Sequence, residues 1–412
     1  MARRPHWWEL VRPPIVGVLV VVLLAVASAL VVGHARLWHT TADERDGQDF
    51  GIFLASVRHA VAGRSLYAPT PLRWRTGGTG TAPLNLNLPH TNLLVWPLAS
   101  LSDRQALIVW TCAGLTLFVV TSAVSLRALR WRWRALPALL VLAYLLAWAP
   151  SAAFSLTAQV SFLLMLPVTA AWLAHRRGHS RAAGVWLGLA AAMKPFLLIF
   201  LPYFVLRRNR PAIVAMVGSL GAVFAIGVVV FGVDSYAEWA RQLPRITWSA
   251  HYFNASLTGI LQRSLGRSYL AVVADAPALV LPLAIALSMV VAAVTFVTLA
   301  RARRRDVDAE WTALLLASLL ISPLGWNYYL WIVLWPAAAL IAAHAPWSRP
   351  QAIDVWLACG LLGWLWWSKM TLWGQPQPLA TLTFGSMYFW ALLAMWRWTL
   401  AMLASSRPTL AG

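Results

Sequence analysis

The chain has little charge and few acidic residues. Only 11% of its 412 residues are charged and 13 are Asp or Glu, whereas 60% are hydrophobic. A soluble domain of this size would have to expose much of that apolar side chain to water. The mean hydropathy of +0.67 therefore excludes a soluble domain and indicates a protein embedded in a membrane.

Cysteines and the common catalytic motifs are also scarce. Cys112 and Cys359 both lie in apolar runs, so we expect neither a disulfide framework nor a metal site. The sequence contains no Walker loop, HExxH, GxSxG or CxxC pattern, which leaves ATPase, zinc-protease and serine-hydrolase functions without support. We expect a protein without a metal or other cofactor.

Lysine is nearly absent, yet the net charge is +20 because arginine is abundant. The arginines form short clusters between apolar runs and do not make one basic face, so nucleic acid is not an expected partner. Clusters at alternate ends of the runs follow the positive-inside rule of membrane proteins. We therefore expect both termini in the cytoplasm and membrane lipids around the chain.

Apolar runs recur along the whole chain and predict a single all-α, polytopic membrane domain over residues 1–412 with about 12 transmembrane helices. The predicted spans are 14–33, 105–126, 136–149, 159–174, 182–193, 196–206, 212–232, 276–300, 309–322, 327–343, 352–367 and 382–403. Several are shorter than the ~20 residues of a perpendicular span. We expect these short or broken helices to be buried in protein or to line a cavity.

Two long polar segments, 34–104 and 233–275, face outward in this topology. In the first, apolar residues recur at helical spacing from Phe50 to Val61 and predict a helix lying in the interface plane. The arginine clusters fall on one side only if 182–206 crosses out and back. The Lys194-Pro195 step is the predicted turn, because proline disfavours helix at the preceding residue.

Four of the 13 acidic residues lie between Asp43 and Asp49, directly after the first span. A carboxylate there can accept a proton from a substrate hydroxyl if it is held within hydrogen-bond reach. A solvated loop is the alternative, and an acid at residue 49 also suits a helix N-terminus. We predict Asp49 as the general base, with Asp46 as the runner-up.

Lys194 is the one charged residue well inside an apolar segment. Charges within membranes are costly and often functional, so we predict that Lys194 binds a lipid-linked phosphate, with a snorkelling lysine as the alternative. In the second outward segment, His251, Asn254 and Ser256 are predicted to hold a sugar or acceptor, and Arg263 a phosphate.

The tripeptide Asp306-Val307-Asp308 has the DxD spacing of nucleotide-sugar enzymes. The predicted topology places it on the cytoplasmic side, beside four arginines. We expect salt pairing there and no metal-bound nucleotide.

Taken in order, the motifs resemble those of glycosyltransferase family 87, in the GT-C superfamily, from about residue 49 to residue 331. The matching positions are Asp49 with Gly63-x-x-x-Tyr67, Gly184-x-x-x-Gly188, Met193-Lys194-Pro195, Asn254-x-Ser256 and Ser322-Pro323-x-x-Trp326. The resemblance implies a GT-C-like bundle with an outward loop layer in a bacterial plasma (inner) membrane. Where histidines are expected after this last motif, the chain has Asn327-Tyr328-Tyr329.

The resemblance also implies a polyprenyl-phosphate-sugar donor, with mannose as the expected sugar, and a lipid or glycan acceptor on the outer face. Asp49 would deprotonate the acceptor in an inverting single displacement, and Trp326 and Tyr328 would contact sugar or acceptor. A transporter or flippase for lipid or oligosaccharide also suits broken helices and a buried charge. A non-catalytic scaffold in cell-envelope assembly is a third hypothesis.

Overall fold

The structure is a computed structural model, which is helical apart from one short β-hairpin. It describes residues 13–43, 49–69, 71–73, 79–81, 85–131, 135–246, 248–266, 271–302, 305–344 and 378–405. Within these residues, β1 (Pro71–Arg73) and β2 (Thr79–Thr81) pair antiparallel, with Leu72 opposite Gly80. The prediction of a helical membrane fold is confirmed outside this hairpin. Asp46 and the predicted span 352–367 lie outside the described residues.

Five described helices are long and apolar enough to cross a membrane, and a bent helix pair would make six. The five long helices are α1 (Pro13–Asp43), α3 (Asp103–Ala128), α9 (Arg210–Phe231), α12 (Val280–Arg301) and α17 (Met387–Ser405), the last preceded by α16 (Pro378–Leu382). In the bent pair, α4 (Ala135–Ala147) and α5 (Ala149–Thr157) meet at 52°. The prediction of about 12 spans is therefore not confirmed.

The remaining predicted spans are short helices that lie mostly inside the protein. They are α6 (Ser161–Arg176), α7 (Ser180–Met193), α8 (Phe200–Leu206), α13 (Val307–Ile321) and α14 (Leu334–His344). In α13 every residue from Asp308 to Leu320 is buried. A helix that is apolar on all sides needs cover on all sides, so α13 forms the centre of the main hydrophobic core.

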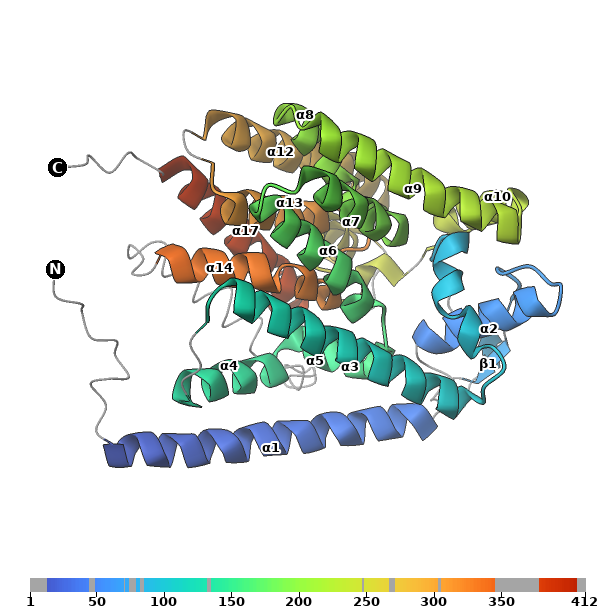
Figure 1. The fold of residues 1–412 in the computed structure, drawn as a ribbon. Coiled ribbons are helices and arrows are strands. Elements are labelled where there is room, and N and C mark those ends of the chain that lie inside the picture. Colours follow the sequence, from blue (N-terminus) through green and yellow to red (C-terminus); the bar gives the residue numbers. More distant parts are fainter. Residues whose placement is uncertain are drawn as a thin grey trace.

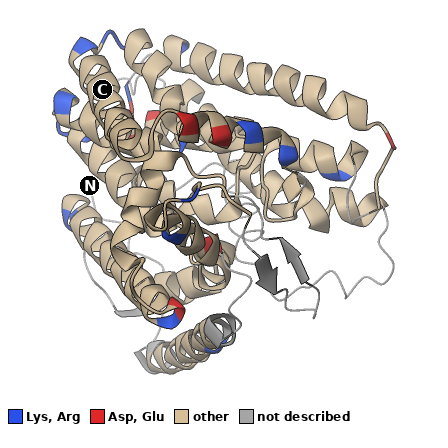
Figure 2. Ribbon diagram, turned by 90° about the vertical axis from the view of Figure 1, so that its right-hand side faces the viewer, with Lys and Arg blue, Asp and Glu red and all other residues tan. Residues whose placement is uncertain are grey.

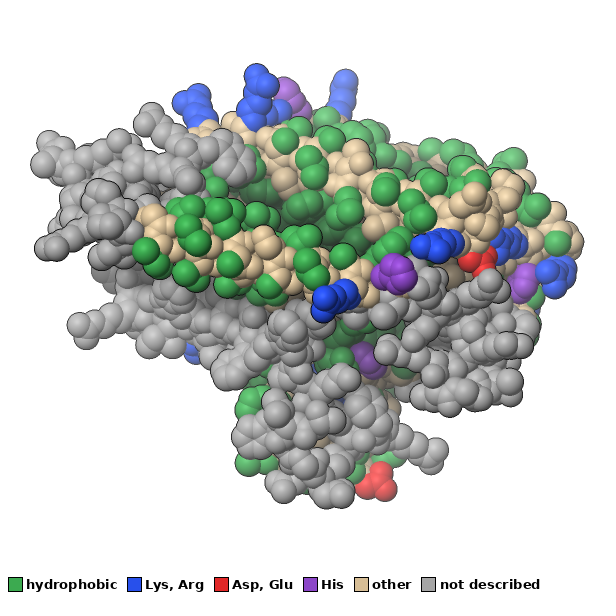
Figure 3. Space-filling model, turned by 90° about the horizontal axis from the view of Figure 1, so that it is seen from below, with side chains coloured by type: hydrophobic (Ala, Val, Ile, Leu, Met, Phe, Trp, Pro, Cys, Tyr) green, Lys and Arg blue, Asp and Glu red, His purple; other side chains and the backbone are tan. Residues whose placement is uncertain are grey.

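Charged residues are sparse along the described helices, most of whose length is neither Lys, Arg, Asp nor Glu (Figure 2). Seen from the side of α1, hydrophobic side chains are spread over the described surface (Figure 3). This is the surface expected of a protein solvated by lipid.

Two glycines bring α7 against α9. A Cβ on Gly184 would lie 2.3 Å from the Ala212 carbonyl oxygen, and one on Gly188 would lie 2.4 Å from the Met216 carbonyl oxygen. Only hydrogen fits between these backbones, which explains the small residues at this spacing. The position of α7 is thereby fixed along its length.

The chain reverses direction at Lys194. Helix α7 ends at Met193, Lys194 is extended with φ −140° and ψ 103°, and η4 (Pro195–Ile199) leads into α8. Beyond α8, the Asn209 side chain donates to Ser180 Oγ over 3.0 Å at the start of α7. The segment therefore runs along α7 and returns, as the out-and-back prediction requires.

The short elements gather at the end of the bundle that lies away from the two termini, where α2, β1 and α10 are seen in Figure 1. These elements include α2 (Asp49–Val61), α10 (Asp234–Gln242), α11 (Leu257–Leu265), η2 (Pro89–Leu94), η3 (Trp96–Leu98), η5 (Leu243–Arg245), η6 (Trp248–Ala250), η7 (Pro277–Leu279), η8 (Asn327–Ile332) and η10 (Phe384–Ser386). Most belong to the two predicted outward segments.

Candidate active site

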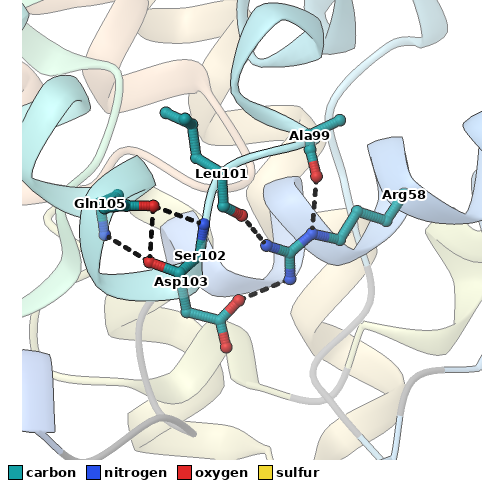
Figure 4. A network of polar contacts seen from close by, with 6 residues as sticks. All are labelled: Arg58, Ala99, Leu101, Ser102, Asp103 and Gln105. Carbon is teal, nitrogen blue, oxygen red and sulfur yellow. Dashed lines mark hydrogen bonds and ion pairs between the residues drawn. The ribbon is translucent and has the colours of Figure 1, made fainter.

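Helix α2 is fixed to the start of α3 by one arginine. Arg58 donates to the carbonyl oxygens of Ala99, at 3.1 Å, and Leu101, at 2.6 Å, and pairs with Asp103 at 2.5 Å (Figure 4). Ser102 and Gln105 next to it form a capping box that begins α3. Because both guanidinium edges are used, α2 is held in one orientation.

The apolar face of α2 is buried in protein. Phe50, Leu54 and Val57 pack with Leu107 and Trp110 of α3 in a small hydrophobic cluster. The Phe50 and Trp110 rings stack with centroids 5.2 Å apart. This packing determines where the first residue of α2, Asp49, is placed.

Asp49 lies beside the break between α5 and α6. Gln159 Nε2 donates a hydrogen bond to Asp49 Oδ2, and Gln159 itself is 6% exposed. Burial raises the pKa of Asp49 above its usual value, while the Gln159 hydrogen bond and the charge of Lys194 lower it in part. A carboxylate with a raised pKa is a stronger base than an ordinary aspartate, which suits proton abstraction.

Lys194 projects from the reversal after α7 toward the same region. Its Nζ donates to Asn87 Oδ1 over 3.0 Å and lies 5.4 Å from the centre of the Tyr329 ring. The ammonium is thus held by an amide and an aromatic face. Among the described residues it forms no ion pair with Asp49, although the two charges influence each other.

Asn87 is itself held by its neighbours. Asn85 Oδ1 accepts from the Asn87 backbone and side-chain amides at 3.0 and 3.2 Å, and Asn85 Nδ2 donates to Asn92. Tyr67 OH donates to the Asn87 carbonyl oxygen over 2.7 Å. The amide that meets Lys194 is therefore positioned in advance by buried hydrogen bonds.

The two predicted outward segments pack against each other around this network. Trp239 of α10 donates to the Leu86 carbonyl oxygen over 3.0 Å, and Ser65 Oγ donates to Glu238. His90 contacts Tyr236 OH at 2.9 Å and the Ala192 carbonyl oxygen at 2.8 Å, just before Lys194. Segments distant in sequence thus converge beside Lys194.

Asn254 and Ser256 lie in a different part of the same layer and are fully buried. Asn254 Nδ2 donates to the Ser249 and Pro323 carbonyl oxygens at 2.9 and 3.0 Å, and its Oδ1 accepts from Ser256 Oγ at 2.8 Å. Ser256 also caps α11. Their hydrogen bonds join the second outward segment to the break after α13, which is a structural role.

Arg263 is likewise inside the protein, with 0% of its surface exposed. Its guanidinium donates to the carbonyl oxygens of His251 and Asn254 at 2.9 and 3.0 Å, and to Ser386 Oγ at 3.1 Å. Burial and the Arg263 charge lower the pKa of His251 to about 4, so this imidazole is neutral at neutral pH. The arrangement assigns Arg263 to shaping the loop.

Aromatic rings connect this loop with Lys194. Trp326 stacks on Tyr328 with centroids 6.0 Å apart, and Tyr328 meets Tyr329 edge-on at 4.8 Å. His251 lies 6.1 Å from Trp326, between centroids. The charge of Asp49 acts on both tyrosine hydroxyls. The predicted residues Asp49, Lys194 and Tyr328 therefore belong to one neighbourhood, which Trp326 and His251 extend.

A second polar cluster lies at the other end of α6 and α7. Glu310 pairs with Arg207 and accepts from Tyr203 OH over 2.7 Å. Asp308 pairs with Arg176 at 2.9 Å, so salt pairing explains this part of the DxD tripeptide. Its partner is on α6 and is not one of the four arginines that precede the tripeptide in sequence. Among the described residues, no group of three or more His, Cys, Asp or Glu is arranged to hold a metal ion.

Sequence reasoning missed three contributors: Gln159, Asn87 and Tyr329. Gln159 and Asn87 are amides within apolar stretches, which was the available signal because polar groups there are costly without a partner. Tyr329 carried no such signal, since an aromatic residue in an apolar run usually packs in a core.

Comparisons with known proteins identify a family and two related sequences. A family model described as glycosyltransferase family 87 matches residues 86–324, which is more than half of the chain. A polyprenol-phosphate-mannose-dependent alpha-(1-2)-phosphatidylinositol mannoside mannosyltransferase of Mycobacterium tuberculosis is 26% identical over 84% of this chain and 83% of its own. The protein of the same name from Mycolicibacterium smegmatis is 27% identical over 90% of this chain and 86% of its own. No solved structure gives a significant match.

Proposed function

This chain belongs to glycosyltransferase family 87, and from that premise we propose that it transfers mannose from a polyprenyl-phosphate donor to a lipid or glycan acceptor. It is a membrane glycosyltransferase. The donor class is supported by the two mycobacterial relatives, whose names describe them as polyprenol-phosphate-mannose-dependent. An acceptor presented at the membrane surface fits the layer of short elements around Asp49.

One observation carries the proposal: Asp49 and Lys194 belong to one neighbourhood, yet each is hydrogen-bonded to a neutral amide and the two do not pair with each other. A direct ion pair would neutralise both groups. Here the carboxylate binds a neutral amide and the ammonium binds another, so each charge stays available to a substrate group. A base and a phosphate-binding cation that are close but unpaired match the needs of glycosyl transfer from a phosphate leaving group.

The proposed reaction is an inverting single displacement. The acceptor oxygen forms a bond to the anomeric carbon while the bond from that carbon to the phosphate oxygen breaks. The acceptor proton passes to Asp49, and the electron pair of the broken bond stays on the lipid phosphate. Lys194, held by Asn87 and Tyr329, stabilises the growing phosphate charge.

The residues of the second outward segment have two proposed roles. Trp326, His251 and Tyr328 offer aromatic surface to the sugar or acceptor. Asn254, Ser256 and Arg263 keep that surface in position through buried hydrogen bonds. The buried hydrogen bonds of Arg263 favour a positioning role over the phosphate-binding role expected from the sequence, and we assign the donor phosphate to Lys194.

The proposed location is the plasma membrane of a bacterium, with both termini in the cytoplasm and Asp49 facing outward. Arginine clusters follow α6 and α8, at the ends of these helices away from Asp49, and support this orientation. The count of about 12 membrane helices remains part of the proposal and requires short helices to be included.

Transfer by purified protein tests the proposal. The protein in detergent is mixed with radiolabelled polyprenyl-phosphate-mannose and candidate lipid acceptors, and labelled product is separated by chromatography. Asp49→Asn should lower transfer by orders of magnitude, whereas the matched control Asp275→Asn, at an exposed position in the second predicted outward segment, should retain it. Movement of intact donor across vesicles without a transferred sugar would instead favour a flippase.

A further inference from the structure

A cavity of about 410 Å³ lies at the end of α6 and α7 remote from Asp49. Gln159 precedes α6 at the Asp49 end, and His175 near the end of α6 lines the cavity. A helix of 16 residues is about 24 Å long, so the two sites are separated by that order of distance. The proposed reaction makes no use of this cavity.

The cavity is lined by more positive than negative charge. Arg207, Arg208 and Arg305 line it together with one carboxylate, that of Glu310. Glu310 is 1% exposed and is neutralised by Arg207 and Tyr203. The exposed Arg208 and Arg305 therefore leave a surplus of two positive charges at the opening.

Two buried donor or acceptor atoms on the cavity wall have no hydrogen-bond partner within the described part of the chain. They are Arg207 Nε and His175 Nδ1. The Arg207 side chain is nine-tenths buried, at 10% exposure. Leaving a charged group's N–H without a partner is costly, so a guanidinium built this way favours a ligand that accepts its hydrogen bond.

Three helices begin at the cavity. Ser180 starts α7, Pro211 lies in the first turn of α9, and Val307 starts α13, and all three residues line the cavity. The N-terminal ends of helices carry partial positive charge, although the side chains of Asn209 and Asp306 already cap backbone N–H groups at the starts of α9 and α13. Their convergence adds to the arginine charge and favours an anion with several oxygens.

We propose that this cavity binds a phosphate group, carried by an anionic phospholipid or present as inorganic phosphate. Exposed apolar side chains adjoin it: Val205 is 61% exposed and Val214 72%. Acyl chains can lie on this surface while the headgroup phosphate occupies the cavity. The bound phosphate joins α6, α8, α9 and α13 at the arginine-rich end of the bundle.

The experiment measures thermal unfolding of the purified protein in nanodiscs of phosphatidylcholine, with or without phosphatidylglycerol. Phosphatidylglycerol should raise the midpoint of unfolding. In Arg208→Gln/Arg305→Gln this rise should disappear, because the affinity for phosphate should fall about tenfold or more when two charged contacts are lost. Both arginines are exposed, so the double variant should fold.

The matched control is Arg177→Gln/Arg181→Gln, which removes two exposed arginines from the same end of the bundle that do not line the cavity. This variant should keep the response to phosphatidylglycerol. A second arm adds inorganic phosphate to protein in phosphatidylcholine alone: a rise there, lost in the cavity variant, identifies free phosphate as the source. Equal responses of the two double variants in both arms would overturn the proposal.

Discussion

The two ends of the α6–α7 pair each hold a carboxylate near a cation, and they are built differently. Glu310 binds Arg207 and Tyr203 directly and is almost fully buried. Asp49 is partly exposed and binds the neutral Gln159, while Lys194 binds the neutral Asn87. The first arrangement neutralises its charges, and the second keeps them apart.

This difference separates a structural ion pair from a reactive one. Direct pairing offsets the desolvation of both groups, so its loss should affect stability. Separated charges gain less from each other, and the raised pKa of Asp49 shows that burial disfavours its ionised form. A fold that keeps such a carboxyl group ionised is less stable than one without it, and this loss of stability is common at functional sites.

The largest expected effect is on the rate at the Asp49 end. Asp49→Asn should lower transfer about 10³-fold, within the usual range for a general base. The folded protein should be as stable or more so, because an acid with a raised folded-state pKa destabilises the fold once it ionises. Initial rates and thermal unfolding of the same preparation measure both. If Asp49→Asn loses both stability and rate, Asp49 does not differ from the structural carboxylate at the other end.

Next in size is a loss of stability at the other end. Glu310→Leu leaves the Arg207 guanidinium buried without its carboxylate, and should destabilise the fold by about 3–5 kcal/mol. Asp49→Leu serves as the matched comparison and should cost much less. Unfolding in a graded series of denaturing detergent measures the loss of stability in each of the two variants. If Glu310→Leu unfolds no more readily than Asp49→Leu, the two carboxylates do not differ as described.

Lys194→Met should reduce kcat/KM for the polyprenyl-phosphate donor about 10²-fold, since the charge that stabilises the leaving phosphate is gone. Lys194→Arg should retain part of the activity because it retains the charge. The acceptor KM should change little in either variant. A donor dependence equal to that of the unaltered protein would remove Lys194 from the phosphate site.

The smallest effect concerns pH. Activity should fall as pH falls through the pKa of Asp49, and this acid limb should lie above 3.8, the usual pKa of an aspartate, because burial raises that pKa. The Gln159 hydrogen bond lowers the pKa, so Gln159→Leu should move the limb to higher pH. Rates measured across pH with both proteins give the shift, and a limb displaced to lower pH would contradict the assigned hydrogen bond.

Much of this layout was predictable from sequence, where local chemistry decides the outcome. The reversal at Lys194 follows from the proline after it, and the long helices follow from apolar runs. Lys194 was selected because charge is rare inside apolar segments, and Asp49 because it lies in the acidic cluster after the first span and matches a motif of the family. A helix from residue 49 was likewise expected from the spacing of apolar residues.

What the sequence did not reveal depends on distant contacts. The partners Gln159 and Asn87 lie 110 and 107 positions from Asp49 and Lys194, respectively, so no local pattern connects them. Asn254 and Arg263 have side chains suited to a ligand, and in the structure they hydrogen-bond to backbone carbonyl groups and to the side chains of Ser256 and Ser386. The predicted count of about 12 spans is not confirmed for a different reason: length and hydropathy do not distinguish a short buried helix from one that crosses a membrane.

The contact of α7 with α9 through Gly184 and Gly188 has a consequence for the far end of α7. Because the two backbones touch without intervening side chains, α7 and α9 should move together as one rigid unit. Lys194 lies at the C-terminal end of α7 in this unit. Thermal motion of the surrounding bilayer can then tilt the helix pair as a whole, but we expect it not to shift the Lys194 ammonium relative to α9. A methyl group at either glycine would force the backbones apart and misalign a charge several turns away.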